Sequence, residues 1–186
     1  MRSSPLLFSI AWIGQAAWVF FALIPVVLVN AVPGLVLAAH ASAPSSLDIT
    51  ALALYAGGLL LETIADRQLW RWMQRKAKGA EEGRWLMTGL RAFCRYPNYL
   101  GEIIVWTGIA TFAVNSVALV PQARSALSLD ILSALVLCYA SPAFVTFLLK
   151  NITGVALTEK RQREKFGHLP EYQQWVARTG TLLPKF

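Results

Sequence analysis

The sequence predicts an all-α protein of the polytopic membrane class, a bundle of about four transmembrane helices. Hydrophobic residues make up 56% of the 186 residues and the mean hydropathy is +0.50, whereas ordinary soluble domains are roughly 45–50% apolar. Seven tryptophans and five tyrosines suit the two interfaces of a bilayer. The charged residues gather between long apolar stretches, as in proteins that cross a membrane several times.

Four apolar stretches are each long enough to cross a hydrocarbon core, which takes about 20 helical residues. We expect them at about 8–32, 48–66, 97–120 and 129–150, within a single membrane domain that covers 1–186. Pro25 and Pro33 should kink or end the first helix, because each removes a backbone donor. Asp48 can cap the second helix, and Pro97 suits the first position of the third.

Basic residues cluster in 67–95 and in 160–185, directly after the second and fourth predicted spans. Lys and Arg beside a span favour the cytoplasmic side, where they also meet anionic lipid headgroups. We therefore expect cytoplasmic segments at 67–96 and 151–186, with both termini in the cytoplasm. The net charge of +7 then indicates membrane lipids, and not nucleic acid, as the partner. The membrane would be the endoplasmic reticulum in a eukaryote and the inner membrane in a bacterium.

Several common kinds of site are not indicated. Cys94 and Cys138 lack metal or redox spacing, and His40 and His168 lie in separate segments, so no metal site is predicted. The sequence contains neither a GxGxxG nor a P-loop signature, and nothing supports a Ser/His/Asp triad.

The stretch CRYPNYLGEIIVW, residues 94–106, places polar side chains at the start of the third predicted helix. If Pro97 is the first helical residue, Asn98 and Glu102 share one face. The unpaired N–H groups of the helix start, beside Arg95, form a natural anion site. Glu102 can accept hydrogen bonds from ribose hydroxyls or an amide. The alternative is a structural ion pair between Glu102 and Arg91 or Arg95.

Glu62 and Asp66, four residues apart at the cytoplasmic end of the second span, can complete the same polar cavity. Their alternative role is to neutralise Arg67 and Arg95.

The C-terminal tail adds Glu159, Tyr172 and Arg178. The tyrosine and the arginine could clamp a phosphate or stack on a base. The alternative for Arg178 is a charge that faces solvent or lipid.

Four blocks occur in order: ETIADRQLWRW, TGLRAFCRYPNYLGEIIVWTGIA, SPAFVTFLLKNITGVALTEKRQREKFG and PEYQQWVARTGTLLP. With them the chain resembles the steroid 5-alpha-reductase-like membrane proteins over about residues 12–186. The pattern is shared with the sterol C14 and C7 reductases, which use NADPH, and in part with the isoprenylcysteine carboxyl methyltransferases, which use S-adenosylmethionine. The resemblance implies these cofactor-binding residues: Glu62, Asp66, Arg95, Asn98, Tyr99, Glu102, Glu159, Tyr172 and Arg178. Tyr96 stands where the family usually has histidine.

The resemblance implies an NADPH-dependent oxidoreductase acting on CH–CH groups, which reduces a C=C bond in a steroid-like, sterol-like or other lipid enone. Its substrate would be a hydrophobic, lipid-like small molecule. One alternative is a membrane methyltransferase of the isoprenylcysteine carboxyl type that uses S-adenosylmethionine. A second alternative is a shortened, non-catalytic relative, because relatives usually carry further helices before this segment. No catalytic residue is assigned; Tyr55 and Tyr139 are the tyrosines inside the predicted spans.

Overall fold

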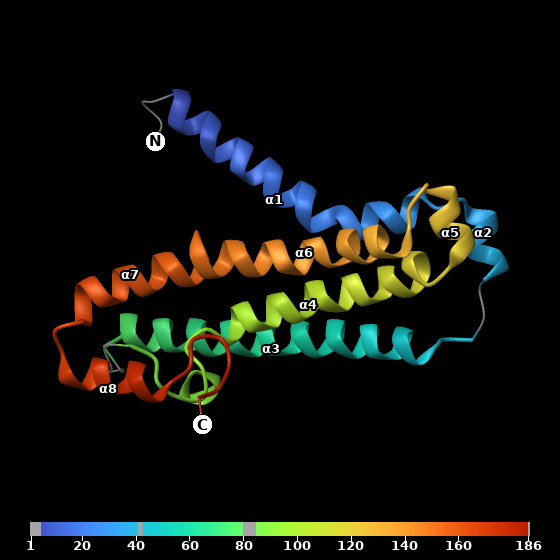
Figure 1. Cartoon of the computed structure of the whole chain (residues 1–186). Coiled ribbons are helices and arrows are strands. Elements are labelled where there is room, and N and C mark those ends of the chain that lie inside the picture. The colour runs from blue at the N-terminus through green and yellow to red at the C-terminus, as the bar shows by residue number, and fades with distance from the viewer. Residues whose placement is uncertain (1–4, 41–42, 80–84, 186) are drawn as a thin grey trace. The chain divides into compact units, whose positions relative to one another are not determined.

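The computed structural model describes residues 5–40, 43–79 and 85–185, and the regular elements in these ranges are helices (Figure 1). The prediction of an all-α fold is therefore confirmed. In chain order the elements are α1 (Pro5–Ala31), α2 (Gly34–Ala39), α3 (Ser46–Ala77), the 3-10 turn η1 (Gly89–Ala92), α4 (Pro97–Ala113), the π-helical turn η2 (Val114–Ala118), α5 (Pro121–Ala126), α6 (Ile131–Asn151), α7 (Gly154–Phe166) and α8 (Pro170–Arg178).

Four helical stretches are long and apolar enough to cross a membrane, at Phe8–Ala31, Ser46–Ala77, Pro97–Ala118 and Ile131–Phe166. This confirms the class of multi-pass membrane proteins. The second stretch extends past the predicted end at 66, because apolar side chains recur at helical spacing among the arginines up to Ala77. The connection at 121–130, which reads as a loop, contains the short helix α5.

The chain forms two compact units, and each is described here by itself. The first unit comprises Met1–Tyr55 and Trp106–Val145, and the second comprises Ala56–Val105 and Thr146–Phe186. Helices α3, α4 and α6 each contribute to both units. The prediction of a single membrane domain stays a prediction.

In the first unit, α1 continues through Pro25 and ends at Ala31, before Pro33. Its ribbon bends along its length in Figure 1. The hydroxyl of Ser141 on α6 donates to the carbonyl of Ala22, at 2.9 Å, and Ser141 is fully buried. A neighbouring helix thus satisfies a carbonyl in the turn before the proline, as is common where proline interrupts a membrane helix.

Helices α3 and α4 pack closely in both units because small residues line their contact. In the first unit, a Cβ on Gly108 would lie 2.8 Å from the carbonyl oxygen of Ala51. In the second, a Cβ on Gly101 would lie 2.7 Å from the carbonyl oxygen of Gly58. Both contacts are too short for any side chain. Small residues seven positions apart on each helix are a usual means of packing helices in a membrane.

The start of α3 is fixed by a reciprocal pair of hydrogen bonds in the first unit. The backbone N–H of Ser45 donates to the Asp48 carboxylate at 2.9 Å, and the N–H of Asp48 donates to the Ser45 hydroxyl at 3.2 Å. Asp48 therefore helps to cap the helix as predicted, together with Ser45. The side-chain amide of Asn115, in η2, donates to both residues, at 2.8 Å to Asp48 and 3.0 Å to Ser45.

In the second unit, the C-terminal segment lies against the chain just before α4. The N–H of Arg95 donates to the carbonyl of Gly180 at 2.9 Å, and the N–H of Tyr96 donates to the carbonyl of Thr181 at 3.1 Å. Gly180 also forms an isolated parallel bridge with Cys94. A Cβ on Gly180 would meet the carbonyl oxygen of Leu183 at 1.8 Å, so this turn requires glycine.

An aromatic cluster forms the core beside α8. Trp85, Tyr172 and Trp175 are buried together, and Phe166 of α7 packs on them. Trp85 contacts Tyr172 edge to face at 5.2 Å between ring centroids. Such edge-to-face pairs are favourable because the positive edge of one ring meets the negative face of the other.

Candidate functional site

Three of the predicted carboxylates come together where α3 meets the start of α4 in the second unit. Because Gly101 has no side chain, the backbone of Glu62 lies directly against it: a Cβ there would be 2.7 Å from the Glu62 nitrogen. Glu102 follows Gly101 and interacts electrostatically with both Glu62 and Asp66. Glu62 and Glu102 are half-buried, and Asp66 is exposed.

This carboxylate cluster, made of Glu62, Asp66 and Glu102, offers acceptors and no donors when ionised. It can bind hydroxyl or amide N–H groups of a ligand, and it repels phosphate. Any phosphate of a bound cofactor would therefore lie away from the cluster, toward the positive charge before α4.

Two buried polar atoms at the start of α4 have no hydrogen-bond partner among the described residues. They are the side-chain Oδ1 of Asn98 and the hydroxyl of Tyr96. Leaving such an atom unpaired costs about 1–3 kcal/mol, so native structures seldom do so without a ligand or water. Both atoms belong to residues at the start of α4 and thus mark this place as a candidate binding site.

Tyr96 is the residue that departs from the family pattern, and it is 1% exposed. Burial raises the pKa of its hydroxyl well above the usual value, with a smaller contribution from the nearby Glu159. The group therefore keeps its proton at physiological pH and can donate a hydrogen bond. Its ring stacks on Tyr99, with centroids 5.8 Å apart. Tyr99 in turn packs against Gly154, where a Cβ would lie 2.8 Å from the ring.

Arg95 is buried, and the protein itself uses most of its hydrogen-bonding capacity. Its Nε donates to Glu159 at 2.8 Å, and Nη2 donates to the hydroxyl of Thr181 at 2.9 Å. Nη1 donates to the carbonyls of Val176, at 3.1 Å, and Thr179. These four bonds leave one of the five guanidinium N–H groups for a ligand. Arg95 thus holds α7 and the C-terminal segment to the start of α4, and its contact with a cofactor stays a prediction.

The three predicted residues of the tail are placed differently from one another. Glu159 is the carboxylate that pairs with Arg95, with a charged contact of 2.8 Å. Tyr172 is 4% exposed within the aromatic cluster, and burial raises the pKa of its hydroxyl. Arg178, at the end of α8, is exposed. The structure therefore groups Glu159 and Tyr172 near Tyr96, whereas Arg178 lies at the surface.

Arg91 is a buried cation, and the sequence indicates it only as a possible ion-pair partner of Glu102. It is 7% exposed, and its guanidinium carbon lies 5.7 Å from the centroid of the Tyr96 ring. Burial lowers the pKa of Arg91, while Tyr96, Tyr99 and Asp66 partly offset that effect. The sequence signal was its place four residues before Arg95 in the segment that leads into α4.

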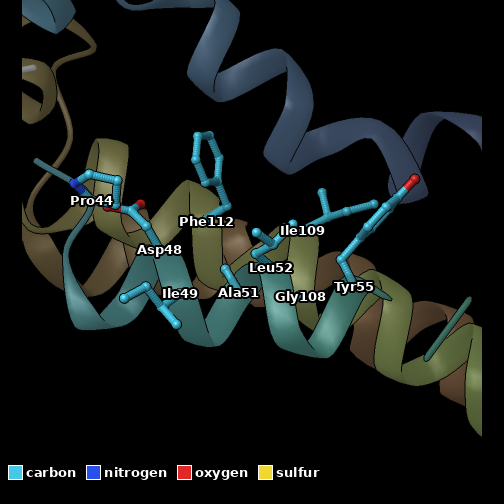
Figure 2. A pocket seen from close by; sticks show the side chains of 9 residues that line it. All are labelled: Pro44, Asp48, Ile49, Ala51, Leu52, Tyr55, Gly108, Ile109 and Phe112. Atoms are coloured by element: carbon cyan, nitrogen blue, oxygen red, sulfur yellow. The ribbon is translucent and has the colours of Figure 1, made fainter. Parts of the chain in front are cut away.

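The first unit contains an apolar hollow of about 410 Å³ between α3 and α4 (Figure 2). Asp48 lies at one end and Tyr55 at the other, and the wall between them includes Leu52, Ile109 and Phe112. Tyr55 is 42% exposed and Tyr139 is 41% exposed, so neither intramembrane tyrosine is enclosed in a site within the described residues. The hollow offers hydrocarbon surface and little hydrogen bonding, as a lipid-facing groove does.

These features define a multi-pass helical membrane protein with a polar site at the start of one of its spanning helices. The model of the family described as a protein of unknown function (DUF1295) matches residues 2–179, and the chain belongs to that family. No curated protein and no solved structure matches the chain.

Proposed function

We propose that the protein is a membrane-embedded reductase that uses NADPH to reduce a C=C bond in a steroid-like, sterol-like or other lipid enone. The proposal rests on the resemblance of the sequence blocks to steroid 5-alpha-reductase-like proteins, together with one structural observation. That observation is the pair of buried polar atoms of Tyr96 and Asn98, which have no hydrogen-bond partner among the described residues and lie in the same unit as the carboxylate cluster.

The residues at the start of α4 fit the parts of a dinucleotide that donate and accept hydrogen bonds. Glu102 and Glu62 would accept from ribose hydroxyls, and the Oδ1 of Asn98 would accept from a carboxamide N–H. Tyr96, which stays protonated, would donate to a ligand oxygen. The negative phosphates would lie on the side of Arg95, where one N–H is still available and the N–H groups of the helix start add partial positive charge.

When bound, NADPH supplies the hydride. The contribution of the chain is to orient the cofactor, to keep water from the reacting bond and to hold the substrate oxygen by hydrogen bonds. A neutral buried hydroxyl such as that of Tyr96 suits the first of these tasks, because it donates to a cofactor oxygen without needing to change its charge.

The test is ligand-induced thermal stabilisation of the full chain in detergent, measured with NADPH, NADH and S-adenosylmethionine. A ligand present at about 100 times its dissociation constant adds about 2.7 kcal/mol to the folded state. We expect stabilisation by NADPH, and we expect Glu102→Gln and Asn98→Leu to remove most of it. Glu164→Gln, which changes an exposed carboxylate on α7, is the matched control and should keep it.

Stabilisation by S-adenosylmethionine alone would replace the proposal with a methyltransferase. A folded protein that responds to none of the three cofactors would indicate the non-catalytic relative. If NADPH stabilises the protein and consumption of NADPH then depends on an added lipid enone, the reductase assignment is supported at the level of chemistry.

A further inference from the structure

A second group of polar atoms without a hydrogen-bond partner in the described part of the chain surrounds a hollow of about 480 Å³ in the second unit. The hollow is walled by the last turns of α3, by the chain from Trp85 to Arg91, and by α7 and α8. Four of its lining side chains bury a polar atom that lacks a hydrogen-bond partner among the described residues. These atoms are Nε1 of Trp85, Nε1 of Trp175, Nε of Arg91 and Oε1 of Gln162.

Three of the four atoms are N–H donors on side chains that are more than nine-tenths buried. Trp85 is 8% exposed, Arg91 is 7% exposed and Trp175 is 4% exposed. Each unpaired donor costs the folded protein about 1–3 kcal/mol. Three donors that line one hollow and have no acceptor among the described residues indicate that their acceptor belongs to another molecule.

The charge of the hollow indicates that this molecule is an anion. Lys76 and Lys165 line the hollow together with Arg91, and none of the described residues that line it is acidic. Lys165 is exposed, and its ammonium group lies 5.3 Å from the centroid of the Phe166 ring. The two exposed lysine ammonium groups thus sit at the rim, and the buried N–H donors, including the cationic Arg91, lie deeper.

The remaining wall is apolar, and it belongs to the part of α3 where the spanning segment ends. Leu69 and Met73 line the hollow beside Trp72, and Leu86 faces them from the following segment. Helix α3 carries Arg75 and Lys76 in its last turn, so this end is suited to the depth of the lipid headgroups. A ligand that fills the hollow would therefore have both an anionic and an apolar part.

We propose that this hollow binds the phosphate headgroup of an anionic phospholipid. The two non-bridging oxygens of a phosphodiester accept from Trp85, Trp175 and Arg91, Lys76 and Lys165 neutralise the charge, and the first carbons of the acyl chains lie along Leu69 and Met73. Basic pockets between membrane helices bind lipid headgroups in this way. The site uses none of the residues assigned above to NADPH, so the two proposals succeed or fail separately.

The test measures binding of short-chain phosphatidylglycerol to the full chain in neutral detergent, by native mass spectrometry and by thermal shift. Phosphatidylcholine is the zwitterionic comparison. We expect saturable binding that favours phosphatidylglycerol. Lys165→Gln should weaken it about fivefold, the effect expected for one lysine near a headgroup. Lys160→Gln removes the same charge from an exposed position on the same helix outside the hollow, and should leave the affinity unchanged.

Trp175→Phe keeps an aromatic side chain, although a smaller one, and removes the indole N–H, so it should weaken binding about tenfold because the lost hydrogen bond is to a charged group. If this variant does not fold, the pair Lys165→Gln and Lys160→Gln still decides the matter. An equal loss in both lysine variants would mean attraction to surface charge alone and would overturn the proposal. Displacement of the lipid by inorganic phosphate or by NADPH would overturn it too, since the site would then belong to a soluble anion.

Discussion

At the start of α3, in the first unit, the carboxylate of Asp48 accepts hydrogen bonds from Ser45 and from Asn115. In the second unit, Tyr96 and Asn98 bury polar atoms that have no such partner in the described part of the chain. The same contrast holds more widely: all the buried unpartnered side-chain atoms found in the described residues belong to the second unit. Both units embed polar side chains among apolar helices, so apolar surroundings alone do not explain the difference.

Whether a buried polar group has a hydrogen-bond partner within the protein indicates whether it stabilises the fold or binds a ligand. A polar side chain whose partners are all in the protein stabilises the fold, and its removal should cost stability without affecting a ligand. A polar side chain whose partner is missing costs stability and is retained for another reason, which is most simply a ligand. Mutations that separate stability from ligand response therefore test the contrast directly.

The largest effect is expected at Arg95, a polar group of the second unit that forms four of its five possible hydrogen bonds within the protein. Arg95→Gln removes a buried ion pair and several hydrogen bonds and leaves Glu159 without its partner, which should lower the free energy of unfolding by about 3–5 kcal/mol. Arg178→Gln, at an exposed position, should change it by less than about 0.5 kcal/mol. Unfolding in a detergent titration measures both. Similar small losses in the two variants would show that Arg95 does not hold the C-terminal segment.

A smaller effect is expected in the first unit, at Asn115. Asn115→Leu removes the two hydrogen bonds to Ser45 and Asp48 and should lower Tm by about 4–8 °C, because each lost bond costs about 1 kcal/mol and 1 kcal/mol corresponds to about 2–4 °C in a chain of this size. The NADPH-induced shift in Tm should be unchanged. Differential scanning fluorimetry with and without NADPH gives both values, and a lost ligand response would contradict the division between the two kinds of polar group.

Tyr96 is expected to behave in the opposite way. Tyr96→Phe removes a buried hydroxyl that has no partner among the described residues, so the ligand-free protein should become more stable, by up to about 1 kcal/mol. The stabilisation by NADPH should fall in the same variant. Tyr139→Phe, which changes a tyrosine that is 41% exposed, is the control and should alter neither quantity. A less stable Tyr96→Phe protein would mean that the hydroxyl has a structural partner.

The last prediction concerns how stability depends on pH through Tyr96, an effect that is absent at neutral pH and appears only at alkaline pH. Burial raises the pKa of Tyr96 above the ordinary value of 10.0, so above pH 10.0 the unfolded chain loses this proton while the folded protein keeps it. The unfolded state then binds fewer protons, and stability falls as pH rises, by at most about 1.4 kcal/mol per pH unit for one group. Tm measured at several alkaline pH values should decline less steeply in Tyr96→Phe than in the wild type. Identical slopes would show that Tyr96 is not buried in solution.

Much of the fold could be predicted from local properties of the sequence. Hydropathy predicts the four spans because a bilayer imposes a minimum length on each. Pro97 marks the start of α4, as its fixed backbone angle suits a first helical position. The four-residue spacing of Glu62 and Asp66 places both on one face of α3. Gly101 of α4 then lets the two helices approach closely enough for Glu102 to lie near that pair.

The rest depended on contacts between distant parts of the chain. Arg95 has the residue type of a phosphate ligand, yet its partners lie 64 to 86 residues further on, where no local pattern pairs them. The hollow whose donors lack a partner among the described residues could not be predicted for the same reason: Trp85 and Trp175 read as interfacial aromatics until the fold places them against one another. Periodicity shows which residues share a helix face, but not which donors remain unpaired after packing.

The attachment of the C-terminal segment to Arg95 and Tyr96 also has a consequence for biosynthesis. Residues 94–96 leave the ribosome before α6, α7 and α8 have been synthesised. Their partners Gly180 and Thr181 follow α8 and are therefore made later still. At about 5–20 residues per second, the nascent chain must keep the Arg95 charge without its native partners for several seconds or longer. During that interval the translocon, a chaperone or lipid headgroups must accommodate it. The polar site therefore matures only after the membrane helices that surround it have been made.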